Sequence, residues 1–182
     1  MNMQVMDHAR GYGVISRFFH WSMAALILWQ AISAALHFLV DETPLADFFF
    51  AWHQPFGLLL LVLVALRAVW GLINIPRRPQ HVGGLDKAAA LGHVAMYGLL
   101  FAVPVIALIR SYGSGRGFSA FGIQIFDKFE PRIEWMTNLG SNWHGELGWV
   151  LLALTAGHIA MAVVHDRAWN ENRIARMTRG SE

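Results

Sequence analysis

Six of the nine histidines in this sequence lie within or beside long apolar stretches. These six are His20, His37, His53, His93, His144 and His158. An ionisable side chain in such a place is costly and usually marks a functional site. The chain has no cysteine, which excludes disulfides, thiolate zinc sites, iron–sulfur clusters and covalent CxxCH haem attachment. Ligation of a metal or of haem iron, and hydrogen bonding between helices, remain as roles for these imidazoles.

Four of the histidines fall at two matching depths. His20 lies near the start of the first apolar stretch, and His53 and His144 lie near the opposite side of the membrane. His158 follows His144 by 14 residues, which places it about 21 Å further along a helix and within roughly 40° of the same face. One helix thus presents an imidazole at each level. We expect His20 to lie opposite His158, and His53 opposite His144.

Two stacked haems suit this arrangement. A neutral imidazole is a good axial ligand, and helical bundles hold cofactors between facing helices. Two imidazoles on each iron favour electron transfer over oxygen binding. Small residues such as Gly57, Gly145 and Gly148 leave room for a flat macrocycle. Hydrogen bonding between helices and metal transport along a chain of histidines are the alternatives.

The apolar stretches that carry these histidines are long enough to span a bilayer, which takes roughly 20 helical residues. We expect spans at about 18–40, 48–73, 91–112 and 139–164. The composition agrees, because 55% of the residues are hydrophobic and only 14% are charged. The first span is too long for a signal-peptide core. The sequence therefore predicts an all-α, integral membrane four-helix bundle, with residues 1–182 forming a single domain.

Basic residues gather on one side of the predicted spans. Ten lie in the N-terminal tail, the second connection and the C-terminal tail: Arg10, Arg17, Arg67, Arg77, Arg78, Lys87, Arg167, Arg173, Arg176 and Arg179. The opposite side has four basic and seven acidic residues. By the positive-inside rule, both termini are expected in the cytoplasm. The net charge is only +2 and the basic residues are scattered, which argues against a nucleic-acid partner.

Several segments are distinctive in their order and spacing: RFFHW, WHQPFGLLLLVLVALRAVWGL, LGHVAMYGLLFAVPVIAL, FSAFG, NWHGELGWVLLALTAGHIAMAVVH and the tail WNENRIARM. Together they resemble the bacterial cytochrome b561 family over nearly the whole chain. The resemblance implies a four-helix protein of the bacterial cytoplasmic (inner) membrane that binds two b-type haems. It also implies four histidine ligands, which match His20, His53, His144 and His158.

One branch of that family resembles superoxide oxidase. The resemblance then implies an oxidoreductase that oxidises superoxide at the periplasmic face and passes electrons to ubiquinone. The alternative is an electron-transfer subunit that relays electrons between the quinone pool and a periplasmic redox partner. An anionic donor should react at the outer haem, because a bare charge does not readily enter hydrocarbon. The quinone site is then expected at the inner haem, on the cytoplasmic side.

Two further residues are expected close to the inner haem. His93 opens the third span at the depth of His20 and His158. It would tune a quinone site, donate to a haem propionate, bond to a neighbouring helix, or replace His20 as ligand. Arg67 follows His53 by 14 residues and so shares its face at the inner depth. It would pair with an inner-haem propionate or extend to the lipid headgroups.

The remaining histidines lie at the margins of the spans. His37 is expected at the outer end of the first span, on a different face from His20. It would line an entrance to the outer haem or have no specific role. His8, His81 and His165 are expected to be solvated, because they lie at or outside the span ends.

The longest connection, about residues 113–138, is expected on the outer side, and a loop of this length is usually either functional or folded over a site. Its segment GRGFSA fits the dinucleotide pattern G-x-G-x-x-A. We reject that match because no βαβ unit is predicted around it. The four outer basic residues are Arg110, Arg116, Lys128 and Arg132. If they gather above the outer haem, they would attract an anion such as superoxide.

Overall fold

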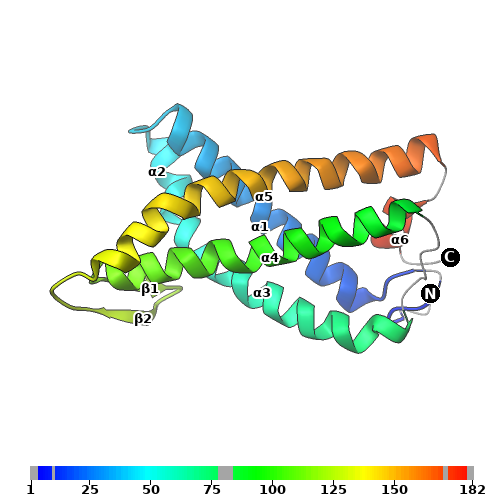
Figure 1. Cartoon of the computed structure of the whole chain (residues 1–182), viewed down its shortest axis with the longest axis horizontal. Helices are drawn as coiled ribbons and strands as arrows, with labels where there is room; N and C mark the ends of the chain where they lie inside the picture. Colours follow the sequence, from blue (N-terminus) through cyan, green and yellow to red (C-terminus); the bar gives the residue numbers. More distant parts are fainter. Residues whose placement is uncertain (1–3, 10, 78–83, 170–171, 180–182) are drawn as a thin grey trace.

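A computed structural model describes residues 4–9, 11–77, 84–169 and 172–179. Among these residues, four helical segments are long and apolar enough to cross a membrane, as the sequence predicts. They run along the long axis of the molecule (Figure 1). The predicted inner residues Arg10 and Arg78 and the predicted solvated His81 lie outside the described residues.

The long helices differ from the predicted spans mainly at their ends. The helices are α1 (Val14–Leu39), α2 (Pro44–Ala51), α3 (His53–Asn74), α4 (Gly84–Gly113), α5 (Glu134–Ala168) and the short α6 (Arg173–Thr178), with a 3₁₀ turn η1 (Ile75–Arg77) after α3. The second predicted span is two helices, α2 and α3, which meet at Trp52. Thr43 begins α2, because its hydroxyl accepts a hydrogen bond from the Ala46 amide at 3.3 Å and Pro44 fits the first helical position.

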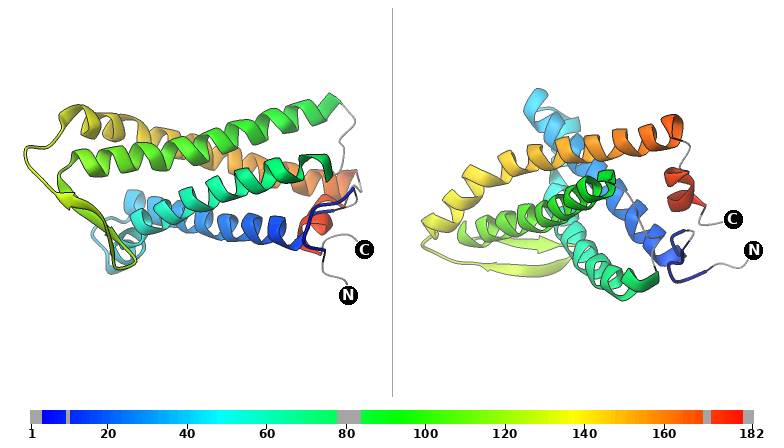
Figure 2. Two further views of the ribbon diagram at one scale, coloured as in Figure 1. Left: turned by 90° about the horizontal axis from the view of Figure 1, so that it is seen from below. Right: turned by 45° about the vertical axis from the view of Figure 1, so that its right-hand side comes forward.

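Two helix pairs make up the bundle. Helix α1 packs on α2 and α3, and α4 packs on α5 and α3, so α5 joins the rest chiefly through α4. In the left view of Figure 2 the four long helices run roughly in the same direction, and the right view shows that α1 crosses α5 obliquely. Their shared core is a cluster of buried apolar side chains: Met23, Leu60, Val64, Leu100 and Leu151. None of these residues lies at the end of its helix, so the cluster lies between the two ends of the bundle.

A β-hairpin covers one end of the bundle, which we call the outer end. Strands β1 (Arg116–Ala120) and β2 (Ile123–Lys128) pair antiparallel within the long connection. The turn residue Phe121 packs on Trp52 and Phe56, with ring centroids 6.3 and 6.2 Å apart, and so anchors the hairpin over α3. The all-α prediction therefore omits a small sheet. The rejected GRGFSA segment lies largely in β1 of a hairpin, where no dinucleotide fold surrounds it.

The described terminal segments meet at the opposite end, which we call the inner end (Figure 1). The buried Asp7 carboxylate accepts from the Gly13 amide at 3.0 Å, and the Asp7 amide donates to the fully buried Asn74 side chain. Helix α6 accepts hydrogen bonds from Arg17 and Trp21 of α1 at 2.9 and 3.0 Å. The N-terminal segment that the structure describes thus bonds to α3, and α6 bonds to α1. From the charge distribution we expect this end to face the cytoplasm.

Helices α4 and α5 approach closely at Gly140. A Cβ atom at Gly140 would meet Cβ, Cγ and Cδ of Arg110, so the arginine stem lies directly across the glycine. Atoms at the base of a side chain cannot move far without shifting the backbone, and overpacking such a contact costs about 1–3 kcal/mol. The contact at Gly140, together with that between Gly113 and Met136, therefore sets the spacing of the α4–α5 pair at the outer end.

We expect Gly140→Ala to lower the free energy of unfolding by about 1–3 kcal/mol, because the new methyl group overlaps the Arg110 stem. Thermal unfolding in detergent, followed by helical circular dichroism, measures the change. Gly98→Ala is the control. A Cβ there meets no atom within 4 Å, and alanine favours a helix more than glycine does. An equal loss of stability in the two variants would contradict the close approach at Gly140.

Candidate functional site

Two pairs of histidines face each other across the bundle, one at each level. The outer pair is His53, the first residue of α3, and His144 of α5, with ring centroids 6.0 Å apart. The inner pair is His20 of α1 and His158 of α5, with ring centroids 6.4 Å apart. The structure therefore brings together the histidines that the sequence pairs by depth. In each pair the imidazoles come from opposite sides of the bundle.

Hydrogen bonds at Nδ1 orient both imidazoles of the outer pair. The hydroxyl of the fully buried Ser33 lies 2.5 Å from His53 Nδ1 and 3.3 Å from the Gln30 carbonyl, and it accepts from Nδ1 when its own proton goes to the carbonyl. His144 Nδ1 donates to the Val103 carbonyl at 3.1 Å, because a carbonyl only accepts. His144 therefore presents the lone pair of Nε2, and His53 does so in the tautomer that donates to Ser33. Histidines that bind metals are commonly oriented by such a bond on the other ring nitrogen.

The inner pair has a different partner. Arg67 Nη1 donates to His20 Nδ1 at 3.2 Å, and a guanidinium group cannot accept, so Nδ1 is the acceptor here. The same nitrogen of Arg67 lies 4.0 Å from Met23 Sδ, and the guanidinium carbon lies 5.8 Å from the centre of the Tyr97 ring. Arg67 thus points into the bundle. The alternative in which it extends to the lipid headgroups does not hold in the structure.

His93 brings a third imidazole to the inner level. Its ring centroid lies 5.3 Å from that of His158, closer than the 6.4 Å between His20 and His158. His158 is therefore the common neighbour of His20 on α1 and His93 on α4. The geometry therefore allows either His20 or His93 to face His158 across a cofactor. These are the same two candidates that the sequence leaves open.

Open space lies beside α5 at Gly148, which is within about 40° of the His144 face. A Cβ atom added at Gly145, Gly148 or Gly157 would meet nothing within 4 Å, and α5 packs on α4 rather than on α1 and α3. Gly57 is expected from the sequence to leave room for a macrocycle, but a Cβ atom there would lie 3.3 Å from Gln30 Nε2 of α1. Gly57 therefore allows α1 and α3 to pack closely. Neutral imidazoles that face each other beside open space fit a bis-histidine haem at the outer level. At the inner level, His20 would also have to move its proton to Nδ1.

Two marginal histidines have specific surroundings. His37 Nδ1 lies 2.9 Å from a carboxylate oxygen of Asp41, and its ring stacks 4.1 Å from Phe50, which in turn stacks on His53 at 5.4 Å. His37 therefore lies beside the outer pair, which is the position required if it lines an entrance to the outer haem. The expectation of a solvated side chain is wrong for His165. It is 8% exposed and packs edge-on against Trp169, because the last turns of α5 fold over α6.

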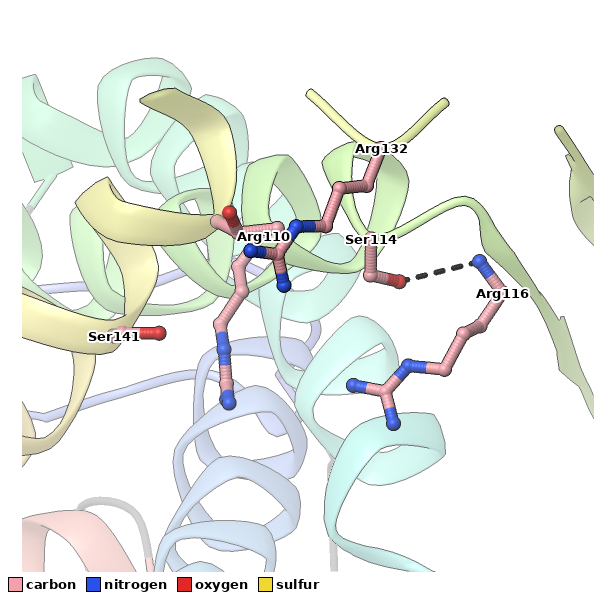
Figure 3. Close-up of a pocket in the computed structure, with 6 residues that line it drawn as sticks. Arg110, Ser114, Arg116, Arg132 and Ser141 are labelled. Carbon is pink, nitrogen blue, oxygen red and sulfur yellow. Dashed lines mark hydrogen bonds between the residues drawn. The ribbon is translucent and has the colours of Figure 1, made fainter. Parts of the chain in front are cut away.

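A basic pocket opens at the outer end, between the end of α4, the start of β1 and the start of α5. It has a volume of about 360 Å³ and is lined by three arginines and three hydroxyl residues: Arg110, Arg116, Arg132, Ser114, Thr137 and Ser141. Figure 3 shows Arg110 and Arg116 extending toward the same side. Three of the four predicted outer cations thus gather, while Lys128 lies outside the pocket, on β2.

The pocket lies directly outward of the outer pair. Thr137 and Ser141 precede His144 by seven and three residues, so all three share one face of α5. Arg110 also acts electrostatically on the His144 ring. Within the described residues, Arg110 and Arg116 have no carboxylate within ion-pair distance, and Arg132 has only the distant Glu134 at 3.9 Å. The pocket therefore presents largely uncompensated positive charge beside His144.

Sequence reasoning missed the residues that orient the outer pair. Ser33 is a lone hydroxyl in an apolar stretch of α1, three residues after Gln30. Both polar side chains reach His53, since Gln30 donates to its carbonyl at 2.9 Å. The sequence feature that identifies Gln30 and Ser33 is a polar side chain within an otherwise apolar span. The Val103 carbonyl carries no such signal, because every residue has a carbonyl.

Comparisons with known proteins identify the family of this chain. The chain matches the family described as prokaryotic cytochrome b561 over residues 11–180. It is also similar to cytochrome b561 homolog 2 of Escherichia coli (strain K12), with 26% identity over 175 residues that cover 91% of this chain and 90% of the relative. The chain therefore belongs to the prokaryotic cytochrome b561 family of multi-pass membrane proteins, which bind b-type haem and transfer electrons.

Proposed function

We propose that this protein binds two b-type haems, one at each level of the bundle. His53 and His144 would hold the outer haem, and His20 and His158 would hold the inner haem. The observation that carries the proposal is the pairing of imidazoles from opposite helices at both levels, 6.0 and 6.4 Å apart. Haem, when bound, supplies a one-electron Fe(III)/Fe(II) couple at each level.

The chain's own residues prepare the outer level for this role. Ser33 and the Val103 carbonyl hold the Nδ1 protons of His53 and His144, which keeps Nε2 of both rings available. At the inner level, Arg67 and His93 lie beside the His20–His158 pair. His93 is exposed on α4 and is placed to pass protons to a reducible ligand that enters between the helices.

We further propose that the electron donor is superoxide and the acceptor is ubiquinone, in the bacterial inner membrane. Two superoxide anions release two electrons and become two molecules of oxygen, and one ubiquinone takes up these two electrons with two protons to form ubiquinol. The basic pocket supports an anionic donor, since it gathers Arg110, Arg116 and Arg132 directly outward of His144. Positive potential around a reactive centre raises the encounter rate of an anion. The quinone would then react at the inner level and take protons from the cytoplasm.

Ligation is tested by haem content. We expect His144→Ala to lose the outer haem and His158→Ala the inner haem, so that each purified variant retains about half the haem, because each iron loses an axial bond. Quantitative optical spectra of the reduced protein measure the haem per chain. Two six-coordinate haems in either variant would refute the pairing. Loss of the inner haem in His93→Ala, together with its retention in His20→Ala, would reassign that ligand to His93.

The role of Ser33 has its own test. We expect Ser33→Ala to weaken retention of the outer haem about 10- to 100-fold, because His53 loses the acceptor that orients its ring. Haem loss to an excess of apo-globin measures the effect. Thr155→Val is the matched control, since the Thr155 hydroxyl bonds only to the Leu151 carbonyl of its own helix, at 2.8 Å. Equal haem retention in the two variants would show that Ser33 does not act on His53.

The donor is tested by mixing the oxidised protein with superoxide in a stopped flow. We expect replacement of Arg110, Arg116 and Arg132 by Gln to slow haem reduction roughly tenfold or more and to weaken its salt dependence. Lys128→Gln removes a charge of the same loop outside the pocket and should have a much smaller effect. Reduction of the inner haem by quinol should stay unchanged in both. Unchanged superoxide kinetics in the triple variant would favour the relay to a periplasmic redox partner.

A further inference from the structure

Arg67 is a cation within the membrane-spanning part of α3, and it is held against the inner pair. Its guanidinium group donates to His20 at 3.2 Å and also acts electrostatically on His158. Within the described part of the chain, no carboxylate lies within ion-pair distance of Arg67. A charge in a span is costly unless it is compensated, so its position beside the two histidines calls for an explanation.

The surroundings of Arg67 hold its charge in place without the bond to His20. The Tyr97 ring lies beneath the guanidinium group, with 5.8 Å from its carbon to the ring centre, and Met23 Sδ lies at 4.0 Å. Cation–π contact of this kind stabilises a partly desolvated guanidinium. When Nε2 of His20 binds iron, Nδ1 carries the proton and no longer accepts from Arg67. The charge then remains between α1 and α4, next to the same ring.

A fixed positive charge favours the oxidation state that carries less positive charge. An iron porphyrin with two neutral imidazoles carries one more positive charge when ferric than when ferrous. Coulomb interactions grow as the surroundings become less polar, so a half-buried cation within a span acts more strongly than one in water. Arg110 is the comparable cation at the outer level, but it is exposed at the end of α4, where water screens its charge.

We propose that Arg67 raises the reduction potential of the inner haem and thereby makes the inner level the electron-accepting end of the pair. The proposal rests on the proposed binding of a haem between His20 and His158. Arg67 acts through its charge on a neighbouring group and is a positioning residue, not a ligand. Its effect is to draw the electron from the outer level toward the inner level, where the acceptor binds.

The test is a redox titration of the purified holoprotein, followed by the optical α-bands. The His144→Ala and His158→Ala variants assign the two waves to the inner and outer haems. We expect Arg67→Met to lower the ratio of reduced to oxidised inner haem at least tenfold at a fixed potential, which is 59 mV for a one-electron couple. The outer wave should stay in place. Arg67→Lys keeps the charge and should keep most of the wild-type inner potential.

Arg77→Met is the matched control, because Arg77 follows the same helix but is exposed, and among the described residues its side chain bonds to the Ile73 carbonyl, at 3.3 Å. It should leave both waves unchanged. An inner wave that does not move in Arg67→Met, with both haems bound, would overturn the proposal. So would loss of the inner haem in both Arg67→Met and Arg67→Gln, since that result indicates a binding role. Failure of the haem assignment itself would instead appear in the wild-type protein, as fewer than two haems per chain.

Discussion

The distance that α5 keeps from α1 and α3 is the constraint on which the rest of the structure depends. Helix α5 packs chiefly on α4, and a Cβ atom at Gly148, near the His144 face of α5, would meet nothing within 4 Å. At the outer end two glycine contacts set the α4–α5 spacing, one between Gly140 and the Arg110 stem and one between Gly113 and Met136. Because α5 is positioned by α4, its two histidines can face partners on α1 and α3 without the helices closing on one another. A bundle packed evenly around one core would fill this space with side chains.

The hydrogen bonds to the histidines differ between the two levels. At the outer level, the Ser33 hydroxyl and the Val103 carbonyl bond to Nδ1 of His53 and His144, and these bonds orient the rings so that Nε2 is available. At the inner level, a cation donates to His20, and a third imidazole, His93, lies beside His158. Charge is thus inside the membrane at one level and at the protein surface, in the basic pocket, at the other. Under the proposed function, this difference in the location of charge sets the direction of electron transfer, from the outer level to the inner level.

Much of this arrangement follows from the sequence, because helical geometry is regular. The 14-residue spacing of His144 and His158 determines both their depth and their shared face, and the structure brings each of them to the expected neighbour. What the sequence does not reveal depends on contacts between segments. The Val103 carbonyl next to His144 has no side-chain signature. The hairpin is also hidden, since its strands are short and its apolar turn residue, Phe121, gains its place only by packing on α3.

The apolar core between the two levels determines whether a proton can accompany an electron from one level to the other. Leu151 lies midway between His144 and His158 along α5, and Leu60 and Val64 occupy the corresponding stretch of α3. These side chains are almost completely buried and offer no group that could relay a proton. An electron that moves between the levels therefore travels without a proton. Each transfer displaces one net negative charge across that part of the bilayer, so turnover in the proposed direction would add to the membrane potential.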